Sequence, residues 1–170
     1  RRLEEAGVPV VVNADYLEKG PLARAEWLKF VALFVDEQER AVEFFEEIER
    51  RYSRLRKRAA QLRRSPTVFL NRPMQGRWVQ PGGESYMARF LHDAGADFVF
   101  SENEKSGALI MDTEAVYAEV VDADYWLHQY GWESLSDVRA HDPRLGRLGA
   151  FLEGNVVNNN ARVNEGGGND

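Results

Sequence analysis

Aromatic and basic side chains in loops are the residues of this chain best suited to ligand chemistry. Trp78 lies in a predicted loop, residues 71–83, between two glycines. A tryptophan in a Gly- and Pro-rich loop can stack on a flat ligand, or it can fold back as a cover on its own domain. Arg162, close to the end of the chain, could hold a carboxylate or another anionic group, and the slightly favoured alternative is a plain surface arginine.

Motifs for catalysis and metal binding are missing from the sequence. Gly82-Gly83 before a helix resembles an anion-binding turn, but Glu84 already supplies negative charge there. The chain has no G-x-G-x-x-G, no phosphate-binding P-loop, no H-E-x-x-H and no G-x-S-x-G. The three histidines form no pair at metal-ligand spacing: His92, His128 and His141. We therefore expect no enzyme, no metal site and no cofactor.

Composition narrows the remaining classes of function. The chain has 170 residues, no cysteine and a formal net charge of -6. Thiolate metal sites are excluded, and an acidic chain of this kind is not expected to bind nucleic acid. No apolar run reaches the roughly 18 residues of a membrane span.

One long charged helix, predicted over residues 36–64, organises the rest of the chain. Asp36 is the expected N-cap with Glu39 completing a capping box, and Pro66 ends the segment. Apolar residues recur at intervals of three and four along it: Val42, Phe45, Ile48, Tyr52, Leu55, Ala59 and Leu62. This stripe indicates a helix that packs on something, so we interpret it as a spacer between two lobes, residues 1–35 and 65–170.

The segments on either side of this helix predict an α/β fold. A β-branched strand at 8–12 and a helix at 22–35 precede it. After it, strands at 67–70, 97–100, 124–127 and 155–157 alternate with helices at 85–94, 113–121, 135–140 and 145–152. Such alternation predicts a Rossmann-like lobe with a mostly parallel sheet.

In a parallel sheet, ligands bind beyond the carboxyl ends of the strands. The loops expected at that edge are 71–83, 101–107, 128–133 and 158–165. The predicted ligand-binding residues near this edge are Trp78, Tyr86, Arg72 and Arg162.

The order of several segments carries a family resemblance. The segments are GVPVVV, ARAEWLKF, the long charged helix, GRWVQPGGESYMARFLHDAGADFVF and MDTEAVYAEVVDADYWL. Together they resemble the helical-backbone (class III) periplasmic substrate-binding proteins of ABC importers for ferric siderophores, haem and cobalamin. The resemblance implies a fragment of a two-lobed binding protein: the end of an N-terminal lobe, an inter-lobe backbone helix and an incomplete C-terminal α/β lobe.

The resemblance also implies partners and a location. Glu114 matches the surface glutamate that pairs with permease arginines in this family, although the macrodipole alone would favour a carboxylate at that helix start. The ligand would be a ferric siderophore, haem or cobalamin, and an aromatic and basic cleft mouth would suit an anionic ferric catecholate. The protein would be periplasmic or at the cell surface, contacting the membrane only through the permease or an upstream lipid anchor.

Two other functions remain open from the sequence. The long helix could serve a non-catalytic interaction module that packs on a partner through its apolar stripe. The α/β lobe could also belong to an enzyme without a recognisable motif.

Overall fold

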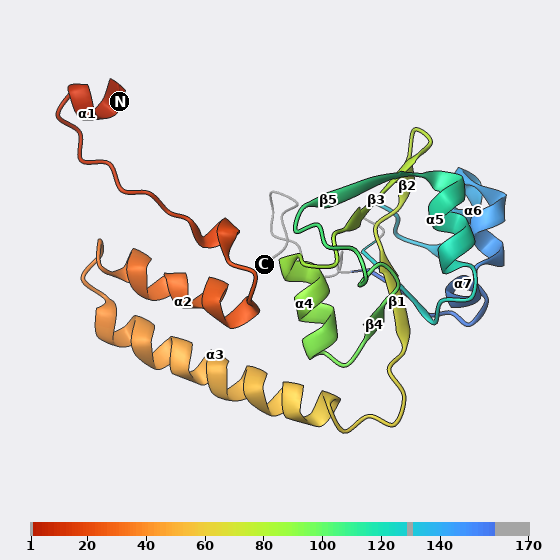
Figure 1. Ribbon diagram of the computed structural model, residues 1–170, viewed down its shortest axis with the longest axis horizontal. Helices are drawn as coiled ribbons and strands as arrows, with labels where there is room; N and C mark the ends of the chain where they lie inside the picture. The colour runs from red at the N-terminus through yellow and green to blue at the C-terminus, as the bar shows by residue number, and fades with distance from the viewer. Residues whose placement is uncertain (1, 129–130, 159–170) are drawn as a thin grey trace.

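The computed structural model describes residues 2–128 and 131–158. Its first part comprises α1 (Arg2–Glu5), a short 3-10 helix η1 (Asp15–Leu17), α2 (Pro21–Ala32) and α3 (Gln38–Ala59). Figure 1 shows α2 and α3 side by side, with α4 between them and the strands of the second part. The described chain thus comprises a helical part up to Ala59 and an α/β part from Thr67 onward.

The predicted long helix is present as α3, but it is shorter at both ends than the predicted range 36–64. Asp36 has φ 57°, in the left-handed region, so it is not the N-cap; that position is Glu37, whose side chain makes no capping hydrogen bond. The helix ends at Ala59, and residues 60–66 lead into the first strand. The capping-box prediction was wrong because Asp36 lies in the turn between α2 and α3, where its backbone is left-handed and not extended as at an N-cap.

Burial of the α3 stripe is partial. Ala41 and Phe45 are buried in the contact with α2, and the Lys29 ammonium lies 4.4 Å from the ring centroid of Phe45. In contrast, Val42 and Leu55 are 42% and 57% exposed. The stripe therefore contacts neighbouring elements along only part of its width.

The strand predicted at residues 8–12 is absent. These residues are extended but form no β pairing, and all of them are exposed. A β-branched run becomes a strand only beside another strand that accepts its backbone hydrogen bonds. The described part of the chain places no strand next to it.

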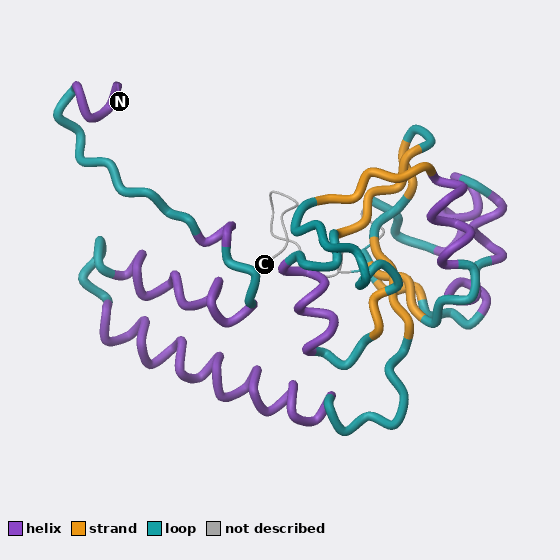
Figure 2. Tube along the Cα trace, in the orientation of Figure 1, coloured by secondary structure: helices purple, strands orange, loops and turns teal. Residues whose placement is uncertain are grey.

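The predicted parallel sheet is confirmed. Its strands are β1 (Thr67–Leu70), β4 (Asp97–Phe98), β6 (Tyr125–Leu127) and β7 (Val156–Val157). They lie in the order β4-β1-β6-β7, and every pairing is parallel. The carboxyl ends of all four strands therefore meet at one edge of the sheet. Figure 2 shows how the strands gather in the α/β part, apart from the helices α2 and α3.

A second, antiparallel sheet was not predicted: two of its strands lie in the predicted loop 71–83, and the third lies between the predicted loop 101–107 and the helix predicted at 113–121. It consists of β2 (Pro73–Met74), β3 (Arg77–Pro81) and β5 (Ala108–Asp112), in the order β2-β3-β5. Gln75 and Gly76, between β2 and β3, both have positive φ, 51° and 76°. This is the backbone of a type I′ hairpin turn, which the sequence conceals because glutamine is not typical of its first position.

The helices of the α/β part follow the prediction closely. They are α4 (Tyr86–Asp93), α5 (Thr113–Val120), α6 (Leu135–His141), the 3-10 helix η2 (Pro143–Arg147) and α7 (Gly149–Leu152). The Ser85 hydroxyl caps α4 by accepting from the Ala88 N–H, at 3.1 Å. The helix predicted at 145–152 is divided in two because Leu148 is extended, with ψ 141°.

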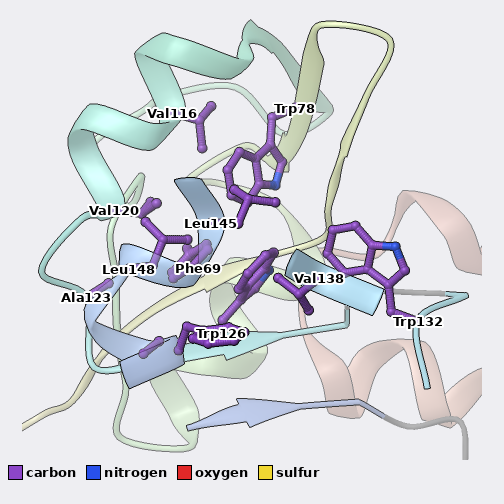
Figure 3. Packing of buried hydrophobic residues seen from close by; sticks show 12 residues of the cluster. Phe69, Trp78, Val116, Val120, Ala123, Trp126, Trp132, Val138, Leu145 and Leu148 are labelled. Atoms are coloured by element: carbon purple, nitrogen blue, oxygen red, sulfur yellow. The ribbon is translucent and has the colours of Figure 1, made fainter. Parts of the chain in front are cut away.

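An aromatic cluster forms the core of the α/β part (Figure 3). Phe69 of β1 lies 5.3 Å from Trp126 of β6 and 5.7 Å from Trp78 of β3, measured between ring centroids. All three side chains are fully buried. The cluster thus packs the antiparallel sheet against the parallel one. It holds β3 next to the strands β1 and β6.

Candidate functional site

The two central strands end in the same unusual backbone conformation. Asn71 directly follows β1 and His128 directly follows β6, with φ 60° and 59°. The Asn71 N–H donates to the Leu127 carbonyl at 2.9 Å, and its side-chain amide donates to the Val79 carbonyl at 2.8 Å. These contacts hold the carboxyl ends of β1 and β6 against the start of the loops that the sequence predicted as a ligand edge.

A cleft lies between this edge and the segment that contains η1. It has a volume of about 420 Å³. Residues from three parts of the chain line it: 16–19, Asn71 with 79–81 and 84–87, and 106–108. The cleft therefore separates the part of the chain before α3 from the part after it.

The two walls of the cleft are rich in aromatic and apolar surface. On one side Tyr16 and Leu17 are 69% and 67% exposed. On the other, Tyr86 stacks on Phe90 with 6.1 Å between ring centroids. Tyr86 thus lies where the sequence predicted a ligand residue, at the start of α4 and on the cleft wall.

Trp78 lies elsewhere than predicted. It is on β3 instead of in a loop, its side chain is 0% exposed, and its indole N–H donates to the Leu70 carbonyl at 3.0 Å. Alternation along β3 buries Trp78 and Gln80, so the indole covers its own domain. With no exposed surface, it offers no platform for a ligand, and this placement corrects the expectation of an open aromatic loop.

Of the two predicted arginines, Arg72 does not line the cleft. The Arg72 guanidinium lies 5.3 Å from the ring centroid of Trp132, against the backbone of Gly131. Arg162 lies outside the described residues. The role of both in ligand binding stays a prediction.

The Gly82-Gly83 pair serves close packing. A Cβ on Gly82 would lie 2.0 Å from the Lys105 carbonyl oxygen, and one on Gly83 would lie 2.1 Å from the Ser101 carbonyl oxygen. The Gly82 N–H donates to the Gly107 carbonyl at 2.8 Å. The turn is therefore occupied by the loop 101–107, which forms part of the cleft rim.

A larger groove, of about 670 Å³, runs on the other side of α4. It is lined by residues of α4 and by Ala96–Phe98 at the edge strand β4, and it shares Lys19 and Glu84 with the cleft. It reaches the end of β4 and the loop after that strand through Phe98, Ser101 and Glu102. The smaller cleft adjoins the end of the central strand β1 through Asn71, and its lining includes the aromatic residues Tyr16 and Tyr86. We therefore regard the smaller cleft as the better candidate for a ligand site.

Glu114 lies in the first turn of α5, away from the cleft lining. Its side chain is 71% exposed and accepts from the Arg144 guanidinium at 2.6 Å. The same guanidinium binds Asp142 at 2.6 Å, and these hydrogen bonds hold the pKa of Asp142 below its ordinary value. Glu114 is thus an accessible carboxylate, and Asp142 holds the Arg144 guanidinium beside it.

The described residues offer no metal site. Within residues 2–128 and 131–158, no three His, Asp or Glu side chains gather in a way that could hold an ion. None of the helices in this part of the chain combines the length and apolarity that a bilayer crossing needs.

Sequence reasoning missed the wall formed by Tyr16 and Leu17. Both lie between the predicted strand at 8–12 and the predicted helix at 22–35, in a segment for which no function was predicted. Their exposed aromatic and apolar side chains were the available signal, but only the folded chain shows that they face the carboxyl edge of a sheet more than fifty residues later.

Comparison with known proteins gives consistent results. A family model described as periplasmic binding protein matches residues 1–162. An uncharacterised lipoprotein of Methanocaldococcus jannaschii is 26% identical over 158 residues, which are 91% of this chain and 37% of that protein.

Solved structures share the fold. The haem-binding protein RhuT from Roseiflexus is 20% identical with a TM-score of 0.72, and 92% of this chain covers 60% of that chain. The haem-binding protein HutB of Vibrio cholerae is 16% identical with a TM-score of 0.71, and 93% of this chain covers 61% of it. An Fe3+-hydroxamate transport protein from Saccharomonospora viridis is 20% identical with a TM-score of 0.68, and 92% of this chain covers 55% of that chain. The chain thus spans little more than half of these structures, and an α/β fragment of a two-lobed binding protein is the fold they share with it.

Proposed function

Because the chain belongs to the periplasmic binding protein family, we propose that it is part of the solute-binding component of an ABC importer. In this proposal the protein works outside the cytoplasm, in the periplasm or at the cell surface, and has no catalytic role. The family match and the similarity to an archaeal lipoprotein support the location. The solute is captured between two lobes and delivered to the permease.

The observation that carries the proposal is the position of the cleft. It lies at the carboxyl end of β1, a central strand of the parallel sheet, between segments that precede and follow the long helix α3. That is where a ligand clasped by two lobes would bind. Its wall residues supply the aromatic and apolar surface that a ring-bearing ligand needs: Tyr16 and Leu17 are exposed, and Tyr86 is half-buried.

We propose a metal chelate as the solute, in the class of ferric siderophores, haem or cobalamin. The names of the structural neighbours RhuT and HutB mention haem, and that of the Saccharomonospora protein mentions Fe3+-hydroxamate. The cleft gives less support to an anionic catecholate. Among its described lining residues the one cation is Lys19, and it is paired with Glu84.

The test is a titration of the full chain with haemin, ferrioxamine B and cyanocobalamin, followed by intrinsic fluorescence. We expect saturable quenching by one ligand, weakened by Tyr16→Ala and by Tyr86→Ala. The matched control is Tyr125→Ala, an exposed tyrosine on β6 outside the cleft lining. Equal effects of all three variants, or no saturation with any ligand, would contradict the proposal.

Glu114 is proposed as a contact with the permease. An exposed carboxylate at a helix start can pair with a partner's arginine, and such a pair affects orientation and association rate more than affinity. We expect Glu114→Gln to slow association with the permease in a low-salt binding assay. Glu119→Gln, exposed at the other end of the same helix, should leave the rate unchanged.

A second candidate, an interaction module built on α3, is favoured by one observation. Leu55 and Leu62 remain 57% and 55% exposed at the basic end of the helix region. Slow hydrogen exchange along α3 in the isolated full chain would favour a packed bridge, and fast exchange that slows only with a partner would favour the module.

A further inference from the structure

Two contacts join the segment before α3 to the start of α4 beside the cleft. The Lys19 ammonium lies 2.7 Å from the Glu84 carboxylate, although the two residues are 65 positions apart. The Arg24 guanidinium lies 5.0 Å from the ring centroid of Tyr86. We refer to this pair of contacts as the cleft latch.

Arg24 reaches both walls of the cleft. Its Nε lies 3.9 Å from the Asp15 carboxylate, in the 3-10 helix that presents Tyr16. Its guanidinium carbon faces Tyr86 on the opposite wall. The Arg24 side chain thus contacts both the segment that carries Tyr16 and the ring of Tyr86, so it links the two walls of the cleft.

Along the chain, these walls are connected only by a long path. It runs through α2, the turn at residues 33–37, α3 and the segment 60–66. A small rotation about such a path changes the cleft width, and contacts at the cleft oppose that rotation. Glu84 and Tyr86 flank the Ser85 N-cap of α4, so the latch acts on a rigid helix end.

We propose that Lys19 and Arg24 are positioning residues that hold the cleft closed at the width its ligand requires. The inference rests on the proposed function, because it takes the cleft as the ligand site. Lys19 and Glu84 are 64% and 52% exposed, so water and salt compete with their ion pair. An exposed pair of this kind shifts a closed-to-open ratio by up to about fivefold, which makes the latch reversible and sensitive to ionic strength.

Distance measurements on the full chain test the latch directly. The sequence has no cysteine, so Leu17→Cys and Ile110→Cys, at side chains 67% and 68% exposed, would carry the only spin labels within these 170 residues. Leu17 lies on the Tyr16 wall and Ile110 on β5 of the α/β part. Pulsed electron resonance then gives the distribution of distances between the two parts.

We expect Lys19→Glu and Glu84→Lys each to lengthen and broaden this distribution. The double variant, which exchanges the two charges, should restore it. Arg24→Gln should act like the single variants, and 1 M NaCl should broaden the distribution of the unsubstituted chain. Lys57→Glu, an exposed charge change on α3, is the matched control and should have no effect.

Two results would overturn the latch. Unchanged distributions in both single variants would show that the ion pair does not set the cleft width. A charge-exchanged double variant no closer to the original than the singles would show that the effect is not specific to this pair.

Ligand binding is measured separately on unlabelled protein. With whichever of haemin, ferrioxamine B or cyanocobalamin binds, we expect the affinity to fall by up to about fivefold in each single variant and to recover in the double variant. Binding that is unaffected while the distances change would refute the positioning role. If none of the three ligands binds, the proposed solute class fails, while the distances still decide whether the latch exists.

Discussion

Replacing Trp78 with alanine should destabilise the fold far more than it affects a ligand. The indole is fully buried between Phe69 and Trp126, and it donates to the Leu70 carbonyl. Deletion of a buried Trp side chain costs about 3–5 kcal/mol in lost transfer energy and cavity formation. Because a domain of this size has about 5–15 kcal/mol of stability in total, Trp78→Ala should come close to unfolding it.

Trp78→Phe separates packing from hydrogen bonding. It retains most of the aromatic volume but loses the indole N–H. The Leu70 carbonyl keeps a second donor, because the Gln80 amide lies 2.5 Å away. No buried acceptor is orphaned, so the cost should be about 1–2 kcal/mol.

Urea unfolding followed by far-ultraviolet circular dichroism measures both effects. Tyr86→Ala provides the reciprocal case, since its half-buried side chain on the cleft wall should cost less stability and more ligand affinity. The reasoning would be refuted if Trp78→Ala unfolded within about 1 kcal/mol of the parent while selectively losing ligand binding. That result would mean the indole leaves the core to contact the ligand.

Three further substitutions test how the site is held. Gly83→Ala places a Cβ 2.1 Å from a backbone carbonyl oxygen and should cost more than about 2 kcal/mol in urea unfolding. Asp124 accepts from the Thr67 N–H and hydroxyl, and these bonds hold its pKa below the ordinary value. Asp124→Asn should cost about 1–3 kcal/mol at pH 7. The difference should shrink as pH falls below about 4, because the carboxylate of the unfolded chain is protonated there before that of the folded chain. Tyr52→Phe removes a donor 2.9 Å from the Asp93 carboxylate, and should cost about 1–3 kcal/mol. Burial and Asp93 raise the Tyr52 pKa, so this difference should stay constant in unfolding experiments up to about pH 10.

Each of these variants has a matched control. Gly107→Ala adds a Cβ with no atom within 4 Å, so it should be close to neutral. Asp122→Asn removes an exposed carboxylate next to the same strand, and Tyr125→Phe removes an exposed hydroxyl. If a control cost as much as its partner, the loss would come from the residue type and not from the contact described.

The sequence by itself determined the order of helices and parallel strands in the α/β part. The apolar runs at 67–70 and 124–127, with helices between them, are local patterns, and in the folded chain they form the paired strands β1 and β6. The approximate position of α3 followed from the same kind of local signal. Placing Tyr86 at a sheet edge needed only the rule that parallel strands end together.

Only the tertiary structure decided which side chains face the cleft. From the sequence, Trp78 was predicted to lie in a loop. Its strand β3 pairs with β5, about thirty residues later, and a strand that depends on such distant pairing has a weak local sequence pattern. The Tyr16 wall and the cleft latch join segments separated by the whole of α3, so no local pattern contains them. Residues 8–12 show the converse: their composition favours a strand, but pairing with a neighbour forms it, and the described chain places none beside them.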